Sequence, residues 1–185
     1  LLIFDEIQTG FGRCGTMFAY ENFDVLPDIL VIGKAFGGGM PIGAFISSYE
    51  IMKLLTHDPM LGHITTFGGH PVNCAAALAN LSVFESENII EEVNAKGNYI
   101  AKKLAHPLVK EIRHIGMFFA IEMENFKIVH QVVKKTLEKG LISYWFLSSD
   151  NAFRIAPPLN ITYNEIDEAC EIIMESMNEI FRNFV

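Results

Sequence analysis

Residues 28–39 read DILVIGKAFGGG, and this stretch decides the fold. Its apolar part, Ile29–Ile32, is short and continuous, which is typical of a strand in a parallel sheet covered on both faces. Gly33 ends the run, Lys34 follows, and three consecutive glycines come soon after. Glycine adopts backbone conformations that other residues avoid, and it lets a ligand approach the backbone closely. The stretch therefore predicts an α/β fold in which a buried strand delivers a lysine into a glycine-rich turn.

A second apolar run, Leu1–Phe4, ends in Asp5. Ligands of open α/β sheets bind outside the carboxyl ends of the strands, so we expect Asp5 and Lys34 at one edge of the sheet. Each residue has an ordinary explanation alone, Asp5 as a helix cap and Lys34 as a solvated lysine. Together they match pyridoxal phosphate, because a lysine can form a Schiff base with its aldehyde and a carboxylate keeps its ring nitrogen protonated. We predict Lys34 to be the catalytic residue.

Three further residues are candidates for contacts with the same cofactor. Thr66 lies in the run TTFGG at residues 65–69, whose hydroxyl and backbone amides suit a phosphate; the alternative is a polar turn. Gln8 follows Asp5 by three residues and could reach the phenolic oxygen of the ring. Ile7 could pack on the ring face, and the alternative for both is loop packing.

Arg154 is the candidate for binding substrate. It stands in the apolar run AFRIAPP at residues 152–158, where an unpaired guanidinium group is unfavourable. A carboxylate that accepts two hydrogen bonds would satisfy it, and a substrate could supply one. The alternative is a structural ion pair with a glutamate or aspartate of the chain.

Composition excludes several classes of function. Half of the 185 residues are apolar and the net charge is −8, with no dominant basic patch, so nucleic acid is not an expected partner. No apolar run approaches the roughly 18 residues that suggest a membrane span. The three cysteines form no CxxC pair, and His63 and His70 lack the spacing of metal ligands. We expect no metal, and a cytoplasmic protein.

The chain is expected to divide into two domains, residues 1–105 and 106–185. The first reads as part of a larger parallel or mixed sheet domain, with a helix over Ile89–Leu104 that residues 86–88 cap. The second reads as a small α+β domain with a strand at Leu141–Leu147. Its last helix, Tyr163–Phe184, begins with a capping box of Thr162 and Glu165. Because the sequence opens inside a strand and without Met, we expect further sequence upstream.

Four segments together resemble the class III, or ω-amino acid type, pyridoxal-phosphate aminotransferases, and in particular the acetylornithine and ornithine branch. They are the aspartate segment DEIQTGFGR, the lysine segment ending GKAFGGGMPIG, the threonine loop TTFGGHP and the arginine segment FRIAPPL, at residues 5–13, 28–43, 65–71 and 153–159. The match covers the whole chain in order. One departure is His70, which stands where asparagine is common in the family.

The resemblance implies fold type I and a homodimer. It implies that Asp5 pairs with the ring nitrogen, Ile7 packs on the ring, Gln8 contacts the 3-hydroxyl and Lys34 binds the cofactor covalently. Thr66 would bind the phosphate of the partner subunit's cofactor, and Arg154 would hold a substrate α-carboxylate. The family's amino-terminal half, with other cofactor and substrate contacts, is absent from this chain.

The expected reaction is transfer of an amino group from an amino acid or ω-amine, acetylornithine- or ornithine-like, to a 2-oxo acid such as 2-oxoglutarate. One alternative is an aminomutase of the glutamate-1-semialdehyde type, which the triplet Phe67-Gly68-Gly69 fits less well. The other alternative is a non-catalytic fragment that retains the fold.

Overall fold

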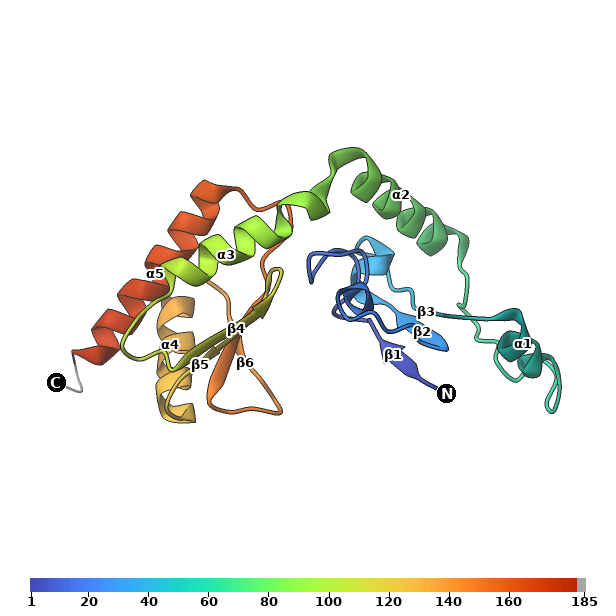
Figure 1. Ribbon diagram of the computed structural model, residues 1–185, viewed down its shortest axis with the longest axis horizontal. Helices are drawn as coiled ribbons and strands as arrows, with labels where there is room; N and C mark the ends of the chain where they lie inside the picture. The colour runs from blue at the N-terminus through green and yellow to red at the C-terminus, as the bar shows by residue number, and fades with distance from the viewer. Residues whose placement is uncertain (183–185) are drawn as a thin grey trace. The chain divides into compact units, whose positions relative to one another are not determined.

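The computed structural model describes residues 1–182, and contacts divide the chain into two compact units, Leu1–Ile90 and a second that begins at Glu91. Figure 1 colours the first unit from blue to green and the second from green to red. The elements of the first unit are β1 (Ile3–Asp5), η1 (Ala19–Asn22), β2 (Ile29–Ile32), η2 (Lys34–Gly37), β3 (Ala44–Ser47), α1 (Tyr49–Met52), η3 (Lys53–Thr56) and α2 (Pro71–Glu87). A short 3-10 helix, η4 (Ile89–Glu92), spans the boundary between the units. Those of the second unit are α3 (Val93–Lys103), β4 (Glu111–Ile115), β5 (Phe118–Glu122), α4 (Phe126–Glu138), β6 (Tyr144–Trp145), β7 (Ala152–Ile155) and α5 (Tyr163–Phe181).

The sheet of the first unit has the order β1-β2-β3, with β1 parallel and β3 antiparallel to β2. The strands predicted from the two apolar runs are therefore present and adjacent. The expected cover on both faces is not found within residues 1–182, because Leu30 and Ile32 are buried while Ile3 is 57% and Ile46 51% exposed. Along β2 buried and half-buried residues alternate, as they do in a sheet with one well-covered face.

Aromatic side chains build the small core of the first unit. Phe11, in the loop after β1, stacks on Phe36 of η2 with ring centroids 5.6 Å apart. It also meets Phe18 edge-on at 5.6 Å and Phe84 of α2 at 6.3 Å. One buried ring therefore joins the loop that follows Asp5, the turn that contains Lys34, and the helix α2.

Helix α2 is longer than a reading of the alanine-rich stretch alone suggests. It starts at Pro71, a favoured first helical residue, and the His70 ring nitrogen Nδ1 accepts the Val72 N–H at 3.3 Å. It ends at Glu87, and Asn88 has the left-handed conformation that terminates helices. The prediction that residues 86–88 cap one helix over Ile89–Leu104 was therefore wrong: they end α2, and a 3-10 turn precedes α3.

The second unit is an antiparallel sheet of order β4-β5-β7-β6 that packs against α3 and α4, and α5 packs against these two helices. Figure 1 shows the three helices gathered beside this sheet. Its core is one continuous cluster of buried side chains that extends from Val93 to Ile180. The sheet contributes Phe119, Ile121 and Phe153 to this cluster, and their side chains are almost completely buried. Since α3 joins this cluster, it belongs with the second unit by contacts; the domain boundary after residue 105 stays a prediction for the intact protein.

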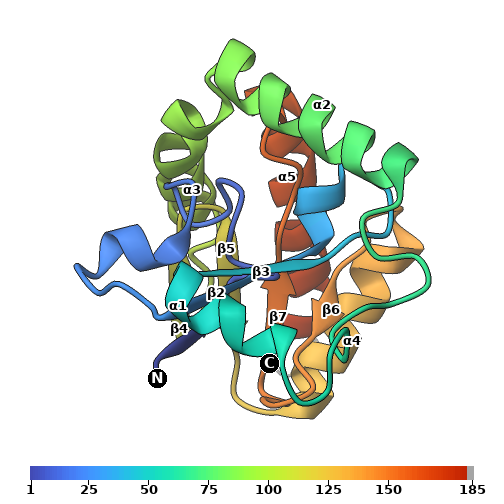
Figure 2. The ribbon, with the colours of Figure 1, turned by 90° about the vertical axis from the view of Figure 1, so that its right-hand side faces the viewer.

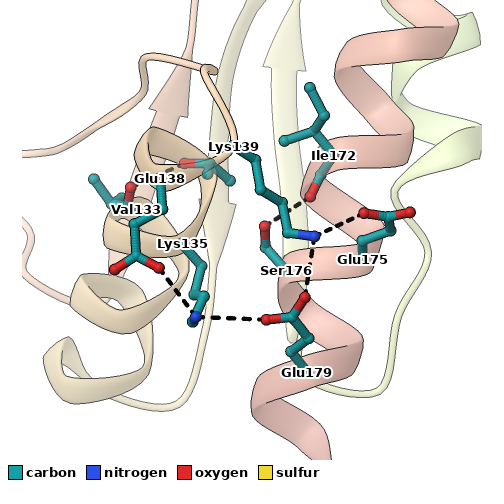
Figure 3. Close-up of polar contacts among 9 residues, drawn as sticks. Val133, Lys135, Glu138, Lys139, Ile172, Glu175, Ser176 and Glu179 are labelled. Carbon is teal, nitrogen blue, oxygen red and sulfur yellow. Dashed lines mark hydrogen bonds and ion pairs between the residues drawn. The ribbon is translucent and has the colours of Figure 1, made fainter.

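The ends of the helices follow local chemistry. The predicted capping box is present, because the Thr162 hydroxyl accepts the Glu165 N–H at 3.3 Å and the Glu165 carboxylate accepts the Thr162 N–H at 2.8 Å. Helix α5 extends to Phe181, and Phe184, where we expected its end, lies outside the described residues. Lys135 of α4 and Lys139, which follows α4, pair with glutamates of α5 (Figure 3).

The strand expected at Leu141–Leu147 is reduced to Tyr144–Trp145. The Leu141 N–H is already taken by the Thr136 carbonyl at 2.8 Å, which closes the end of α4 around Gly140. Leu147 is fully exposed. The apolar character of this stretch therefore does not reflect a long strand, because its first residue completes a helix end.

Candidate cofactor and substrate sites

Asp5 and Lys34 lie at neighbouring carboxyl ends of the sheet. β1 and β2 run parallel with Asp5 opposite Val31, and Lys34 follows Val31 by three residues. Lys34 is exposed, and its φ of +45° lies in the left-handed region that side-chain-bearing residues rarely adopt. Such strained residues cluster at functional sites, where the surrounding structure holds them in place. The edge thus presents an amine and a carboxylate together, as the sequence predicts.

The turn after β1 carries the other two predicted contacts. One carboxylate oxygen of Asp5, Oδ1, accepts the Ile7 N–H at 3.0 Å, which fixes the start of the turn. A Cβ placed on Gly33 would lie 3.4 Å from Cγ2 of Ile7, so the Ile7 side chain sits against the backbone that precedes Lys34. Gln8 follows in the same turn and is half-buried. The structure therefore brings Asp5, Ile7 and Lys34 together, with Gln8 in the adjoining turn.

Glu6 is a residue that sequence reasoning did not single out. It is only 3% exposed, although it stands between two residues of an open sheet edge. Its carboxylate accepts the Tyr20 N–H at 2.8 Å and the hydroxyl of Thr9. The one local signal was Thr9 at a spacing of three; the other partner is fourteen residues away and could not be inferred.

Helix α2 holds the turn that follows Lys34. The amide groups of Asn80 and Asn73 donate to the carbonyls of Ala35 and Pro41, each at 2.7 Å. These asparagines are about two helical turns apart and so share one face of α2. In Figure 2 the light-blue turn after β2 lies beside α2. Gly38, with φ of +56°, allows this approach, because a Cβ there would lie 2.9 Å from that of Asn80.

Thr66 lies in an exposed loop between η3 and α2. Its neighbours form local turns, with the Gly68 N–H bonded to the Thr65 carbonyl at 3.3 Å. Among residues 1–182, no hydrogen bond connects Thr66 with Asp5 or Lys34. A role for Thr66 in binding phosphate stays a prediction.

Arg154 lies in the second unit, on β7, beside a cavity of about 420 Å³ that is lined by Tyr144, Trp145, Phe146, Leu147 and Arg154 itself. Its guanidinium carbon is 5.5 Å from the centre of the Tyr144 ring, directly across the strand pair. Within the described part of the chain no carboxylate is in ion-pair distance of Arg154, whereas Arg113 of the same sheet pairs with Glu122 at 3.0 Å. The predicted alternative, a structural ion pair, is therefore not found among these residues. The guanidinium group of Arg154 can donate hydrogen bonds to an external carboxylate.

Two of the three cysteine thiols, those of Cys14 and Cys170, are buried and poorly suited to act as nucleophiles. Burial raises the pKa of the Cys14 thiol, and the nearby Glu6 carboxylate raises it further against the opposing effect of Arg13. Burial likewise raises the pKa of Cys170 to about 11. Residues 1–182 contain no group of three His, Cys, Asp or Glu side chains that could hold a metal ion. None of the described helices combines the length and apolar character required to cross a membrane.

The residues at the sheet edge fit pyridoxal phosphate by their chemistry. An exposed lysine amine, a carboxylate and a carboxamide on adjoining turns match the aldehyde, the ring nitrogen and the phenolic oxygen. The glycine-rich turn leaves the backbone open, since a Cβ on Gly39 would meet nothing within 4 Å. The phosphate contact is the part of the fit that these residues do not supply.

Comparison with known proteins agrees with this chemistry. Residues 1–177 match the sequence profile of the family described as aminotransferase class-III. Two curated relatives are acetylornithine aminotransferases, from Methanocaldococcus jannaschii at 42% identity and from Caldanaerobacter subterraneus subsp. tengcongensis at 40%. Each alignment covers 97% of this chain and 45% of the relative. The chain therefore spans about half the length of the curated relatives it matches.

Solved structures agree on the fold. A transaminase obtained by ancestral reconstruction superposes with a TM-score of 0.90 at 30% identity, over all of this chain and 45% of the other. A Bacillus anthracis aminotransferase gives a TM-score of 0.88 at 33% identity, over 97% of this chain and 45% of that one. The predicted fold, the α/β fold of type I pyridoxal-phosphate transferases, is confirmed. With a family profile matched along nearly its whole length, the chain belongs to the class-III aminotransferases.

Proposed function

We propose that the intact protein transfers an amino group from an amino acid or ω-amine to a 2-oxo acid such as 2-oxoglutarate, with pyridoxal phosphate as cofactor. The observation that carries this proposal is that Asp5 and Lys34, whose φ is +45°, lie at the ends of two adjacent parallel strands. Acetylornithine- or ornithine-like donors are favoured, because both curated relatives named above are acetylornithine aminotransferases.

Each residue at the edge has a distinct task in this proposal. When bound, the cofactor supplies an electron sink for the carbon that gives up its proton. Lys34 Nζ would hold the cofactor covalently between turnovers and would move a proton at the reacting carbon of the substrate. Asp5 keeps the ring nitrogen protonated by its negative charge. Ile7 would pack on the ring, and Gln8 would donate to the phenolic oxygen.

The remaining contacts concern the substrate and the partner subunit. Arg154, free of any carboxylate among residues 1–182, would bind the α-carboxylate of the donor or acceptor with two parallel hydrogen bonds. We further propose a homodimer in which Thr66 binds the phosphate of the partner subunit's cofactor, which agrees with its exposed loop. A cytoplasmic location is inferred from three free cysteines, two of them buried.

Reductive trapping tests the proposal. Borohydride treatment of the intact protein with pyridoxal phosphate should attach the cofactor irreversibly to the peptide that contains Lys34. Mass mapping would identify this labelled peptide. Lys34→Ala should abolish the label and lower turnover by about 10²- to 10⁴-fold from the lost proton transfer alone. The control is Lys53→Ala, since Lys53 is an exposed lysine of the same unit that pairs with Glu50.

Substrate dependence separates the alternatives. Turnover with acetylornithine should require an added 2-oxo acid. Turnover of an amine donor without any acceptor would favour the aminomutase and overturn the transaminase proposal. A protein that takes no label at Lys34 and stays colourless with excess cofactor would be the non-catalytic fold.

A further inference from the structure

The Glu6 side chain lies on the opposite side of the chain from Asp5. Asp5 is exposed at the sheet edge, whereas Glu6 is 3% exposed, as expected when neighbouring side chains of an extended segment point to opposite faces. Glu6 therefore does not reach a ligand at this edge. Its position between Asp5 and Ile7 nevertheless places it inside the proposed cofactor-binding segment.

Four hydrogen bonds converge on Glu6. Its carboxylate oxygens accept the Tyr20 N–H at 2.8 Å and the Thr9 hydroxyl. Its backbone N–H donates to the Val31 carbonyl at 2.9 Å, and its carbonyl accepts the Gly10 N–H at 3.0 Å. Two of these bonds tie Glu6 to β2 and η1, and the other two close residues 6–10 into a turn that carries Ile7 and Gln8.

A buried carboxylate is unfavourable unless its oxygens are hydrogen-bonded, and its bonds to protein donors are about twice as strong as neutral ones. Removing the carboxylate would leave the Tyr20 N–H and the Thr9 hydroxyl without their partner. Without the carboxylate the turn would also be less ordered. Cofactor binding would then have to offset the entropy lost on ordering it. The buried charge of Glu6 therefore stabilises the shape of the turn, and through this shape it increases the affinity for the cofactor.

We propose that Glu6 is a positioning residue, whose buried carboxylate holds residues 5–10 in the shape that presents Asp5 and Gln8 to the cofactor ring. This inference rests on the proposed function, because it assumes that the ring binds at this edge. It adds a task for a residue that touches neither cofactor nor substrate.

The test uses the intact enzyme with pyridoxal phosphate as the probe. For Glu6→Ala we expect the dissociation constant of the cofactor to rise about tenfold or more, because bonds to a charged group are lost. The pH midpoint of the bound cofactor's visible absorbance should shift in the direction that Asp5→Asn gives. Glu6→Gln should recover most of both quantities, since its amide can accept from Tyr20 and donate to the Thr9 hydroxyl.

The matched control is Glu21→Ala. The Glu21 carboxylate accepts the Phe18 N–H at 2.8 Å in the same unit, but it is exposed and bonds outside the turn. It should leave affinity and pH midpoint unchanged.

A folded Glu6→Ala protein with wild-type affinity and midpoint, beside an Asp5→Asn variant that shifts, would overturn the inference and leave the proposed function intact. If Glu6→Ala does not fold, Thr9→Val removes one of the two carboxylate bonds with little change of shape. An unchanged affinity and an unchanged midpoint in Thr9→Val would equally overturn it. A wild-type protein that takes no label at Lys34 would instead remove the proposed function.

Discussion

The second unit has a continuous core from Val93 to Ile180, whereas the core of the first consists of Phe11, Leu30 and Ile32 with half-buried neighbours. The residues of the proposed chemistry at the sheet edge, Asp5 and Lys34, lie in the unit with the smaller core. Binding elements often come from the less stable parts of a protein, because they must open and close. Local hydrogen bonds and ring stacking, more than apolar burial, therefore shape the sheet edge that carries Asp5 and Lys34.

The same substitution in the two cores tests this contrast most strongly. Ile121→Ala empties a fully buried site opposite Phe153, and we expect it to lower the free energy of unfolding of the second unit by about 4 kcal/mol. Ile32→Ala, in the less enclosed core, should cost about 2 kcal/mol. Trp145, the only tryptophan, reports on the second unit by fluorescence, and amide hydrogen exchange on β2 reports on the first.

Both units must be followed separately, because a single transition cannot be assumed for two units. Equal costs for the two substitutions would contradict the idea that the first unit depends less on its core.

Alanine substitutions of two glycines, one in each unit, compare how closely the backbone of each unit is packed. A Cβ on Gly97 of α3 would collide with the Gly116 carbonyl oxygen, so Gly97→Ala should destabilise the second unit by about 2 kcal/mol. In a helix without such a collision, alanine is about 1 kcal/mol more stabilising than glycine. A loss of stability on Gly97→Ala would therefore by itself indicate the collision. Urea unfolding followed by Trp145 fluorescence measures the change.

Gly39→Ala is the counterpart in the first unit. It meets open space but has a φ of +97°, and we expect a cost of about 1 kcal/mol from the strained backbone alone. A larger effect at Gly39 than at Gly97 would show that the glycine-rich turn is more tightly packed than the structure has it.

Much of the fold and part of the site followed from local patterns. The strands ending near Asp5 and Lys34 were predictable because each apolar run is short and a charged residue follows it within two positions. The capping box at Thr162 was predictable because both partners lie within one turn. The burial of Glu6 was not, because its partner Tyr20 is fourteen residues away and charged residues are rarely buried.

The errors have the same origin. Apolar residues at 141–147 suggested a strand, but the Leu141 N–H bonds to the end of α4 instead. Residues 86–88 suggested the cap at the start of a helix, but the left-handed backbone of Asn88 ends α2 instead. In both cases the residue types fit two different elements, and a hydrogen bond or a backbone conformation decided which element formed.

Asp167 gives a smaller, pH-dependent effect within the second unit. Its carboxylate bonds to Lys103 Nζ at 2.9 Å and to the Tyr99 hydroxyl at 2.8 Å, and these bonds hold its pKa below the ordinary value. A lowered pKa stabilises the fold above the pKa of the unfolded chain, about 4, and that stability disappears as the pH falls through the folded value. Asp167→Asn should therefore destabilise the protein at pH 7, and the difference should vanish in acid. Unfolding curves at several pH values measure it; a constant difference would contradict the linkage.

The ion pairs of α4 and α5 should matter least. Lys139 pairs with Glu175 at 2.8 Å and with Glu179 at 3.0 Å, but all these side chains are partly exposed (Figure 3). Exposed pairs gain little because water and salt screen them. Lys139→Met should therefore change stability less than any substitution above, with a difference that fades as salt is added. A Lys139→Met, Glu175→Gln double-mutant cycle measures the pairing, and a salt-independent loss as large as that of Ile121→Ala would mean that the charges, not the core, hold these helices together.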